Sequence, residues 1–343
     1  MGESLEIVRV DPPAAVAGGE VVVECRNFER RRIRSGKVFF KEKRAWLVGA
    51  SPRRLLALVP DFEEGGEVEV VLEDGEGVRS APARIVAGKK LAEDLHLVAS
   101  PAVDPGDGSV VVTRSGSRGQ QVPVSLYRID RDGELHGLHG EITNPTGIAF
   151  DDRGRMYVSS RLDGIVYRVT ADQDVTPFVS DLGVATGLAF DRLGYLYVGD
   201  RQGKIFRVNG AGESEEWARS EASVSAYHMA FGPDASLYLT GPTVSSYDTV
   251  TRIDEHGRRS TFFRGLGRPQ GLAFDRDGTL YVAASYRGRR GVVAIDRGGQ
   301  EARLVVAGMN VVGLAFNSAG DMLVATNEAV YSLPLGIRGT LVK

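Results

Sequence analysis

His228 is the residue of this 343-residue sequence whose type and position first suggest chemistry. It stands where four other copies of a repeated segment carry glycine, namely Gly147, Gly187, Gly271 and Gly313. The imidazole of histidine titrates near neutral pH, so His228 is a candidate general base or ligand-binding group. The alternative is that His228 fills space in a divergent copy of the repeat, and the sequence leaves both interpretations open.

Polar residues beside the same motif form the rest of the candidate site. Some come directly before the glycine position, and others follow the next predicted strand. Guanidinium groups match the geometry of carboxylates and phosphates, so this set predicts a recognition surface for a small molecule or a peptide. The alternative is a hydrated loop surface. The predicted ligand-binding residues are Thr146, Arg161, Thr186, Asp200, Arg201, Tyr227, His228, Gln270, Tyr286 and Arg287.

Short strands in a long repeat must position these residues. Equivalent positions recur at steps of 40 to 43 residues, and a period near forty is typical of propeller blades. A typical copy has a short apolar run, an Asp-x-x-Gly turn, a Leu-Tyr-Val strand and a third, alternating strand, and the turn of the His228 copy is divergent. A degenerate copy beginning at Pro101 makes the count six. We therefore predict a six-bladed β-propeller over residues 95–343.

The last copy lacks an evident outer strand. We expect its blade to be completed either by residues 339–343 or by residues 95–98, which arrive from the N-terminal side. The second arrangement would tie the two ends of the propeller together.

Residues 1–88 contain no copy of the repeat and predict a separate small β-sandwich. Five runs of alternating or apolar residues are divided by Pro- and Gly-rich turns, a pattern typical of all-β sandwiches. Residues 89–94 are expected to be a linker. The predicted fold class is thus all-β, with a sandwich followed by a propeller.

The N-terminal residues resemble the IPT/TIG family of immunoglobulin-like domains. The motifs that match are Pro12-Pro13, Gly18-Gly19, Asn27-Phe28, Ser51-Pro52 and Val59-Pro60. The family's glycines before Asn-Phe and after Val-Phe are replaced here by Cys25-Arg26 and by Phe40. The resemblance implies an immunoglobulin-like sandwich that serves as a spacer or an interaction module.

The repeat resembles NHL-type blades and, more broadly, the gluconolactonase group of six-bladed propellers. That group holds a divalent metal in the central channel with Glu, Asn and Asp residues, two of which precede the glycine of the motif. The matching positions here carry no carboxylate, and Gln270 stands where the group has Asp. We therefore expect no cofactor. If the protein is a lactonase-like hydrolase after all, the resemblance implies a divalent cation such as Ca²⁺, Mg²⁺, Mn²⁺ or Zn²⁺.

Charge and composition narrow the possible partners. The net charge is −3 and the calculated pI is about 6.0, which gives no general attraction to nucleic acid, so nucleic-acid binding is not expected. Residues 26–54 hold eleven Lys and Arg, including the run at residues 30–34, but residues 61–76 hold eight Asp and Glu. The basic run is either a solvated face or a docking patch for a polyanion or an acidic partner.

Several further residues have ordinary expected roles. Apolar runs are only of strand length and no leader-like segment is evident, so we expect no membrane span and a cytoplasmic location. The single cysteine, Cys25, is expected to be buried in a strand. His136 and His139 are expected to be exposed, and the Asp-rich segments at residues 130–133 and 275–278 are expected to be turns rather than calcium loops.

The sequence therefore predicts a non-catalytic binding or scaffold protein. Its propeller channel mouth and rim would recognise an unidentified small molecule, protein or peptide. The alternative is a divalent-metal-dependent, lactonase-like hydrolase with an atypical channel site.

Overall fold

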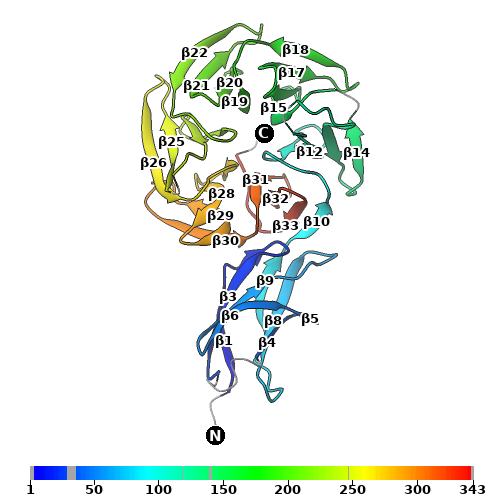
Figure 1. Ribbon diagram of the computed structural model, residues 1–343, viewed down its shortest axis with the longest axis vertical. Coiled ribbons are helices and arrows are strands. Elements are labelled where there is room, and N and C mark those ends of the chain that lie inside the picture. The colour runs from blue at the N-terminus through cyan, green and yellow to red at the C-terminus, as the bar shows by residue number, and fades with distance from the viewer. Residues whose placement is uncertain (1–3, 29–35, 118, 139–140, 246, 341–343) are drawn as a thin grey trace.

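The computed structural model describes residues 4–28, 36–117, 119–138, 141–245 and 247–340. In this part of the chain all regular structure is β-strand, and the repeated strands are arranged as a propeller (Figure 1), which confirms the predicted all-β class and propeller. The basic run at residues 30–34 and His139 lie outside the described residues. The described part contains no helix long and apolar enough to cross a membrane.

The propeller consists of antiparallel four-stranded units, six of them within the described residues. Unit 1 is β11 (Ala102–Val103), β12 (Val110–Thr113), β13 (Leu126–Ile129) and β14 (Leu135–Leu138). Unit 2 is β15 (Pro145–Phe150), β16 (Met156–Ser160), β17 (Val166–Val169) and β18 (Val175–Val179). Unit 3 is β19 (Ala185–Phe190), β20 (Leu196–Asp200), β21 (Lys204–Val208) and β22 (Ser214–Arg219).

The remaining units complete the ring. Unit 4 is β23 (His228–Phe231), β24 (Leu237–Thr240), β25 (Asp248–Ile253) and β26 (Arg259–Leu266). Unit 5 is β27 (Leu272–Phe274), β28 (Leu280–Tyr286), β29 (Arg289–Ile295) and β30 (Ala302–Ala307). Unit 6 is β31 (Val311–Phe316), β32 (Met322–Thr326), β33 (Val330–Leu333) and β10 (Lys89–Ala92). Each innermost strand contacts the next, and β31 contacts β11, so the ring is closed.

Glycine recurs in the innermost strands because neighbouring units approach there too closely for a side chain. A Cβ atom on Gly147 would lie 2.4 Å from the carbonyl oxygen of Thr186, and one on Gly187 would lie 2.7 Å from that of Tyr227. These distances are shorter than the contacts that real Cβ atoms make with backbone, so a side chain here would push the two units apart. The repeated glycine therefore sets the spacing of the units around the channel.

The Asp-x-x-Gly segments form the predicted turns. In unit 2 the Asp151 carboxylate accepts hydrogen bonds from the amides of Arg153 and Arg155, at 3.0 and 2.9 Å. Gly154 closes the turn with a φ of 74°, which glycine adopts without strain. Asp275 caps its turn in the same way, with 3.0 and 2.8 Å bonds from the amides of Asp277 and Thr279.

Aromatic side chains join the units to one another. Tyr157 of β16 makes edge-on contacts with Phe178 of β18 and with Phe190 of the next unit, at centroid distances of 5.0 and 5.1 Å. Tyr238 repeats the arrangement with Phe262 and Phe274. Each such pair stabilises the fold by about 1 kcal/mol, beyond the stabilisation that comes from the apolar area it buries. The recurring Leu-Tyr-Val and Ala-Phe motifs are thus explained by packing between units.

Unit 6 is completed by neither of the segments that the sequence suggested. Its outermost strand is β10, which pairs antiparallel with β33 (Lys89 opposite Ser332). Residues 89–92 are therefore part of the propeller and not of a linker, which corrects the predicted boundary. The amides of Leu95 and Leu97 continue the contact by donating to the carbonyl oxygens of Glu328 and Asn327, at 3.1 and 2.9 Å. Closure does come from the N-terminal side, but through an earlier segment than expected.

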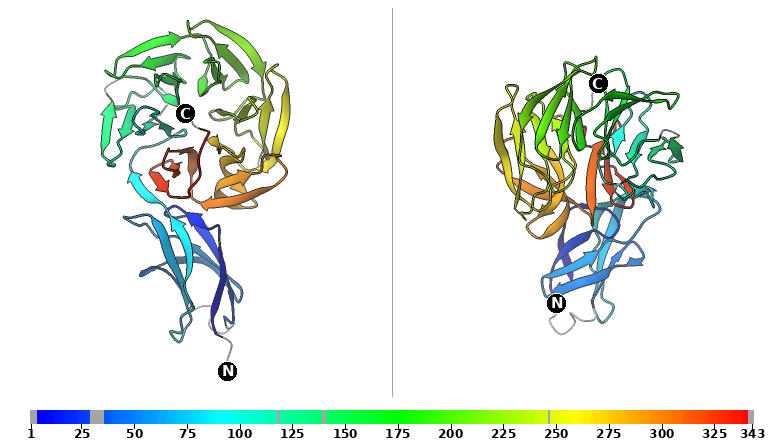
Figure 2. Two further views of the ribbon diagram at one scale, coloured as in Figure 1. Left: turned by 180° about the vertical axis from the view of Figure 1, so that it is seen from behind. Right: turned by 45° about the horizontal axis from the view of Figure 1, so that its top comes forward.

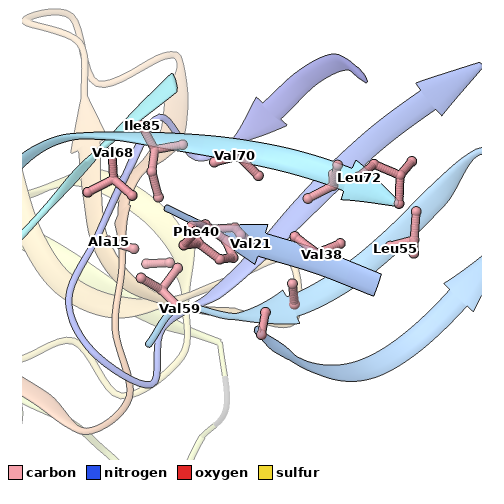
Figure 3. Packing of buried hydrophobic residues seen from close by; sticks show 14 of the residues in the cluster. Ala15, Val21, Val38, Phe40, Leu55, Val59, Val68, Val70, Leu72 and Ile85 are labelled. Atoms are coloured by element: carbon pink, nitrogen blue, oxygen red, sulfur yellow. The ribbon is translucent and has the colours of Figure 1, made fainter. Parts of the chain in front are cut away.

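The N-terminal strands pack face to face around their own core. They are β1 (Glu6–Asp11), β2 (Ala14–Ala15), β3 (Glu20–Arg26), β4 (Lys37–Phe40), β5 (Lys43–Arg44), β6 (Trp46–Ser51), β7 (Arg54–Leu58), β8 (Gly66–Glu73) and β9 (Ala83–Ala87). One sheet has the order β1-β3-β7-β6, and the other contains β2-β9-β8-β4-β5. Figure 3 shows Val21, Phe40 and Leu72 from the two sheets within the core between them. Cys25 is buried in β3, as predicted, and burial raises the pKa of its thiol to about 11.

The second N-terminal sheet runs without a break into the propeller. Strand β2 pairs in parallel with both β9 and β30, so one nine-stranded sheet extends from unit 5 to β5. The Arg289 guanidinium of β29 also forms an ion pair with Asp11 and donates to the Asp11 carbonyl. The junction is visible in both views of Figure 2. The N-terminal strands and the propeller are therefore connected by a continuous sheet and an ion pair, and not only by the polypeptide chain between them.

Candidate functional site

A cavity of about 1100 Å³ follows the axis of the propeller. Its wall is largely apolar, because the innermost strands present Ile148, Leu188, Met229, Leu272 and Leu314 to it. The strand starts form one end of the cavity, and the Asp-x-x-Gly turns form the other. We call these ends the strand-start mouth and the turn mouth.

The strand-start mouth carries uncharged polar groups. Ser100, Thr146, Tyr227 and His228 all line the cavity there. Three of the predicted site residues are therefore brought together, namely Thr146, Tyr227 and His228. Ser100 was not predicted, since it lies before the degenerate first copy of the repeat. An apolar wall with a few fixed polar groups is typical of small-molecule sites.

His228 is held neutral by its surroundings. It is 6% exposed, and its ring makes no hydrogen bond to any residue in the described ranges. Burial lowers its pKa to about 4, since the imidazolium form would lose its hydration without gaining a charged partner. At neutral pH the ring can therefore accept or donate a hydrogen bond but carries no charge.

The local backbone explains how unit 4 accommodates a histidine in place of glycine. In β15 and β19 the pairing with the next strand slips near the glycine. In β23 the pairing is regular, with His228 opposite Thr240 and Met229 opposite Leu239. The innermost strand of unit 4 thus takes a different course from its neighbours at the position where the side chain differs.

Tyr227 lies beside His228 and is also buried, with 2% of its surface exposed. Its ring fills the space over Gly199 and Gly241, where an added Cβ would lie 3.4 and 2.7 Å from the nearest ring atom. Burial raises the pKa of its phenol to about 12, so the hydroxyl keeps its proton.

Two predicted site residues have structural hydrogen bonds instead of facing the cavity. The Thr186 hydroxyl donates to the Gly199 carbonyl at 3.0 Å and accepts from the Tyr227 amide at 3.1 Å. The buried Asp200 carboxylate accepts from the amides of Val184 and Gln202, at 3.0 and 3.2 Å. Both residues are 1–2% exposed and do not line the cavity. Their position in the repeat indicated a site, but the backbone groups around them use their polar atoms.

The predicted rim residues lie around the strand-start mouth but do not converge. The Arg161 guanidinium donates to the Ser115 hydroxyl and to the Gly116 carbonyl, at 3.1 and 3.2 Å, so it holds a loop of unit 1. Arg201 and Arg287 are exposed, and Arg287 lies 5.1 Å from the ring centre of Tyr286. Gln270 is half-buried and does not line the cavity. Its amide donates to the Ala283 carbonyl of β28, and its carbonyl accepts from the Thr240 hydroxyl.

The turn mouth is partly covered by the chain itself. Residues 334–340 leave β33 and cross the turns, and Gly339 forms a bridge with Asp275 while the Thr340 amide donates to Phe274 at 3.0 Å. In Figure 1 the red segment that follows β33 accordingly runs towards the centre of the ring. A Cβ on Gly339 would lie 2.7 Å from Phe316, so only glycine fits at this close approach. Residues 339 and 340 thus bond to unit 5 at the turn mouth instead of completing unit 6, which was one of the two predicted arrangements.

The residues of the channel do not fit a hard divalent cation. Such ions prefer several oxygen ligands with at least some negative charge. The polar side chains at the strand-start mouth are hydroxyls and a neutral imidazole. The carboxylates that line the cavity, Asp151, Asp152 and Asp191, belong to the turn mouth, where Asp151 and Asp191 accept hydrogen bonds from the amides of their own turns. The described residues contain no group of three or more His, Cys, Asp or Glu placed to hold a metal. We therefore derive no reaction step through a metal.

No protein-family model and no curated protein sequence matches the chain. Solved structures do match it. An auxiliary nutrient binding protein from Bacteroides thetaiotaomicron has a TM-score of 0.56 at 13% identity, over 96% of this chain and 97% of its own. Because this match covers nearly all of both chains, it includes the N-terminal strands as well as the propeller.

Two matched enzymes share the propeller. A gluconolactonase from Xanthomonas campestris has a TM-score of 0.56 at 18% identity, over 74% of this chain and 89% of its own. A virginiamycin B lyase from Staphylococcus aureus has a TM-score of 0.52 at 13% identity, over 89% of this chain and 97% of its own. At these identities the likeness concerns the fold alone. It supports the propeller and is compatible with either a binding protein or a lactonase-like one.

Proposed function

We propose that the protein is a non-catalytic binding protein whose propeller channel takes up a small, uncharged and partly apolar molecule. The observation that carries the proposal is the cavity of about 1100 Å³, with apolar walls and with Thr146, Tyr227 and the neutral His228 at its strand-start mouth. At the strand-start mouth an ion would lose its hydration without finding a charged side chain, since the charged residues that line the cavity, Asp151, Asp152, Asp191, Arg192 and Arg276, belong to the turn mouth. A molecule with an apolar body and one or two hydrogen-bonding groups would lose less hydration, and its polar groups would bond to those of the mouth.

The fold comparisons support binding without specifying it, since the matched structures include a nutrient binding protein as well as enzymes. The metal-dependent lactonase alternative has less support, because the described residues contain no group of three or more His, Cys, Asp or Glu placed to hold a metal. A peptide at the rim has support from the exposed Arg201 and Arg287 only. A cytoplasmic location stays a prediction from the sequence.

We further propose that the six units are the blades of a six-bladed, NHL-like propeller, and that the N-terminal strands are an IPT/TIG-like immunoglobulin domain. The closed ring of innermost strands supports the first assignment. The two packed N-terminal sheets support the second. Because β2 joins both parts in one sheet, this N-terminal domain would act as a rigid base for the propeller.

Titration with Nile red, an uncharged dye whose fluorescence rises in apolar surroundings, tests the channel as the binding site. We expect saturable binding of one dye per protein. The variant His228→Trp places a larger ring at the strand-start mouth and should weaken binding by about ten-fold, equivalent to about 1.4 kcal/mol.

The matched control is His136→Trp, which adds the same ring at an exposed position of β14. It should bind the dye as the wild type does. Equal affinity of the wild type and His228→Trp, or an absence of saturable binding, would refute the channel as the site.

A further inference from the structure

A second pocket, of about 390 Å³, lies away from the channel axis between units 3 and 4. Leu239 and Ile253 of unit 4 pack against Tyr197 and Ile205 of unit 3 on the same face. Farther out on this face the side chains become polar. The pocket is lined there by hydroxyl, carboxylate and guanidinium groups from the ends of both units.

The pocket exists because unit 4 lacks a large side chain that most other units have. Thr251 of β25 pairs with Leu239 of β24. The residues at the same register in the third strands of the other units are Tyr127, Tyr167, Phe206, Val293 and Tyr331. Four of these five are aromatic and pack between neighbouring units. Threonine at this position therefore leaves a space that a ring occupies elsewhere.

Two buried polar atoms that line this space have no hydrogen-bond partner among the described residues. They are the Tyr227 hydroxyl and the Oδ2 atom of Asp248, and their residues are 2% and 3% exposed. The other carboxylate oxygen of Asp248 accepts from the Thr243 hydroxyl and amide, at 2.6 and 3.2 Å, so the side chain is fixed. A buried polar group without a partner costs about 1–3 kcal/mol, and more if charged. A ligand that bonds to the Tyr227 hydroxyl and to Asp248 Oδ2 would remove this cost, and both groups are positioned to make such bonds.

The charges and hydroxyls of the pocket indicate the kind of ligand. Arg259 and Arg264 balance Glu221 and Asp248, so the pocket has no net charge. A free carboxylate oxygen requires a donor, whereas guanidinium groups require acceptors. Hydroxyl groups supply both. The exposed ring of Tyr247 at the edge adds an apolar face.

We propose that this pocket binds a small neutral polyhydroxylated molecule of monosaccharide size, with ligand hydroxyls bonding to Asp248 and Tyr227. This site is separate from the channel cavity, although the Tyr227 ring borders both. The proposal therefore does not depend on the function proposed for the channel.

Saturation-transfer NMR with D-glucose, D-galactose, D-mannose and myo-inositol, each up to about 10 mM, tests this site at the weak affinities usual for such ligands. We expect transfer to at least one of the four. Thr251→Phe restores the ring found in other units and should abolish the transfer. Thr251→Val keeps the side-chain volume and is the matched control, so transfer should persist.

Two more variants keep the proposal testable if Thr251→Phe fails to fold. Asp248→Asn removes the charged acceptor and should weaken binding about ten-fold or more. Tyr227→Phe should weaken it as well, whereas Tyr195→Phe, which removes an exposed hydroxyl of unit 3, should not. No transfer to any of the four compounds, or equal transfer in the wild type and Asp248→Asn, would overturn the proposal.

Discussion

Lowering the pH should destabilise the wild-type protein more than it destabilises a variant that lacks the His228 imidazole. Burial lowers the pKa of His228 from 6.5 to about 4. Between these values the unfolded chain binds a proton that the folded protein does not, so stability is lost as the pH falls. The stabilisation is fully present above pH 6.5, and the whole difference in pKa corresponds to about 3 kcal/mol. About 2 kcal/mol of it should already be lost at about pH 5.

The assay is urea unfolding of the wild type, His228→Gln and His228→Phe at about pH 7.5 and about pH 5. Other groups titrate in all three proteins, so the informative quantity is the difference between wild type and variant at each pH. The wild type should lose about 2 kcal/mol more than either variant over this range. The two variants should agree with each other whatever their absolute stability, because neither has a ring that titrates.

Parallel loss of stability in the three proteins would refute the reasoning. It would mean that water or a neighbouring group solvates the imidazolium in the folded protein. Proton NMR supplies a direct check, because the chain has only five histidines and the His228 signal is the one missing from the variant spectra. That signal should not titrate until the pH is well below 6.5.

Three further outcomes follow from the contacts described above. Gly147→Ala should lower the free energy of unfolding by more than about 2 kcal/mol, since the added Cβ would lie 2.4 Å from a backbone oxygen. Gly210→Ala should be neutral or slightly stabilising, because nothing lies within 4 Å of the added Cβ. Thermal unfolding of the two variants compares these effects. Arg289→Ala breaks its bonds to Asp11, so it should cost about 1–2 kcal/mol and speed proteolysis at the junction of the two parts. Cys25 should not react with a thiol reagent at about pH 8 in the folded protein, but should react fully in urea, as absorbance of the released product would show. Equal effects of the two glycine variants, unchanged proteolysis or rapid native labelling would each contradict the corresponding contact.

The repeat was readable in the sequence because each of its signals is local. The Asp151 turn needs only an aspartate and, three residues later, a residue with positive φ, a position that favours glycine and is taken by Gly154. The alternating strands and the period of the repeat are equally local. Gly147 belongs to the same local pattern, since Gly147 and Gly187 both approach the following unit closely.

Chain closure was not readable, because it depends on contacts between distant residues. Strand β10 pairs with β33 across more than two hundred residues, and its own sequence resembles a linker as much as an edge strand. Strand β2 has only two residues, yet it joins the two parts of the chain in one sheet. Short edge strands carry little pattern of their own, so their pairing is decided by the partner they meet.

The candidate site divides in the same way. The sequence pointed to His228, because it replaces a glycine that four other copies keep, and to Tyr227 directly before it. Only the tertiary structure showed that Thr186, Asp200 and Arg161 spend their polar atoms on neighbouring backbone and loops. The carbonyl to which Thr186 donates and the more distant of the amides bonded to Asp200 lie in the same unit but on another strand or loop, and the partner of Arg161 lies in unit 1, so none of them can be read from the sequence next to the residue. The sequence alone therefore determined the repeating scaffold, while burial and contacts between units decided which of its polar side chains remain available to a ligand.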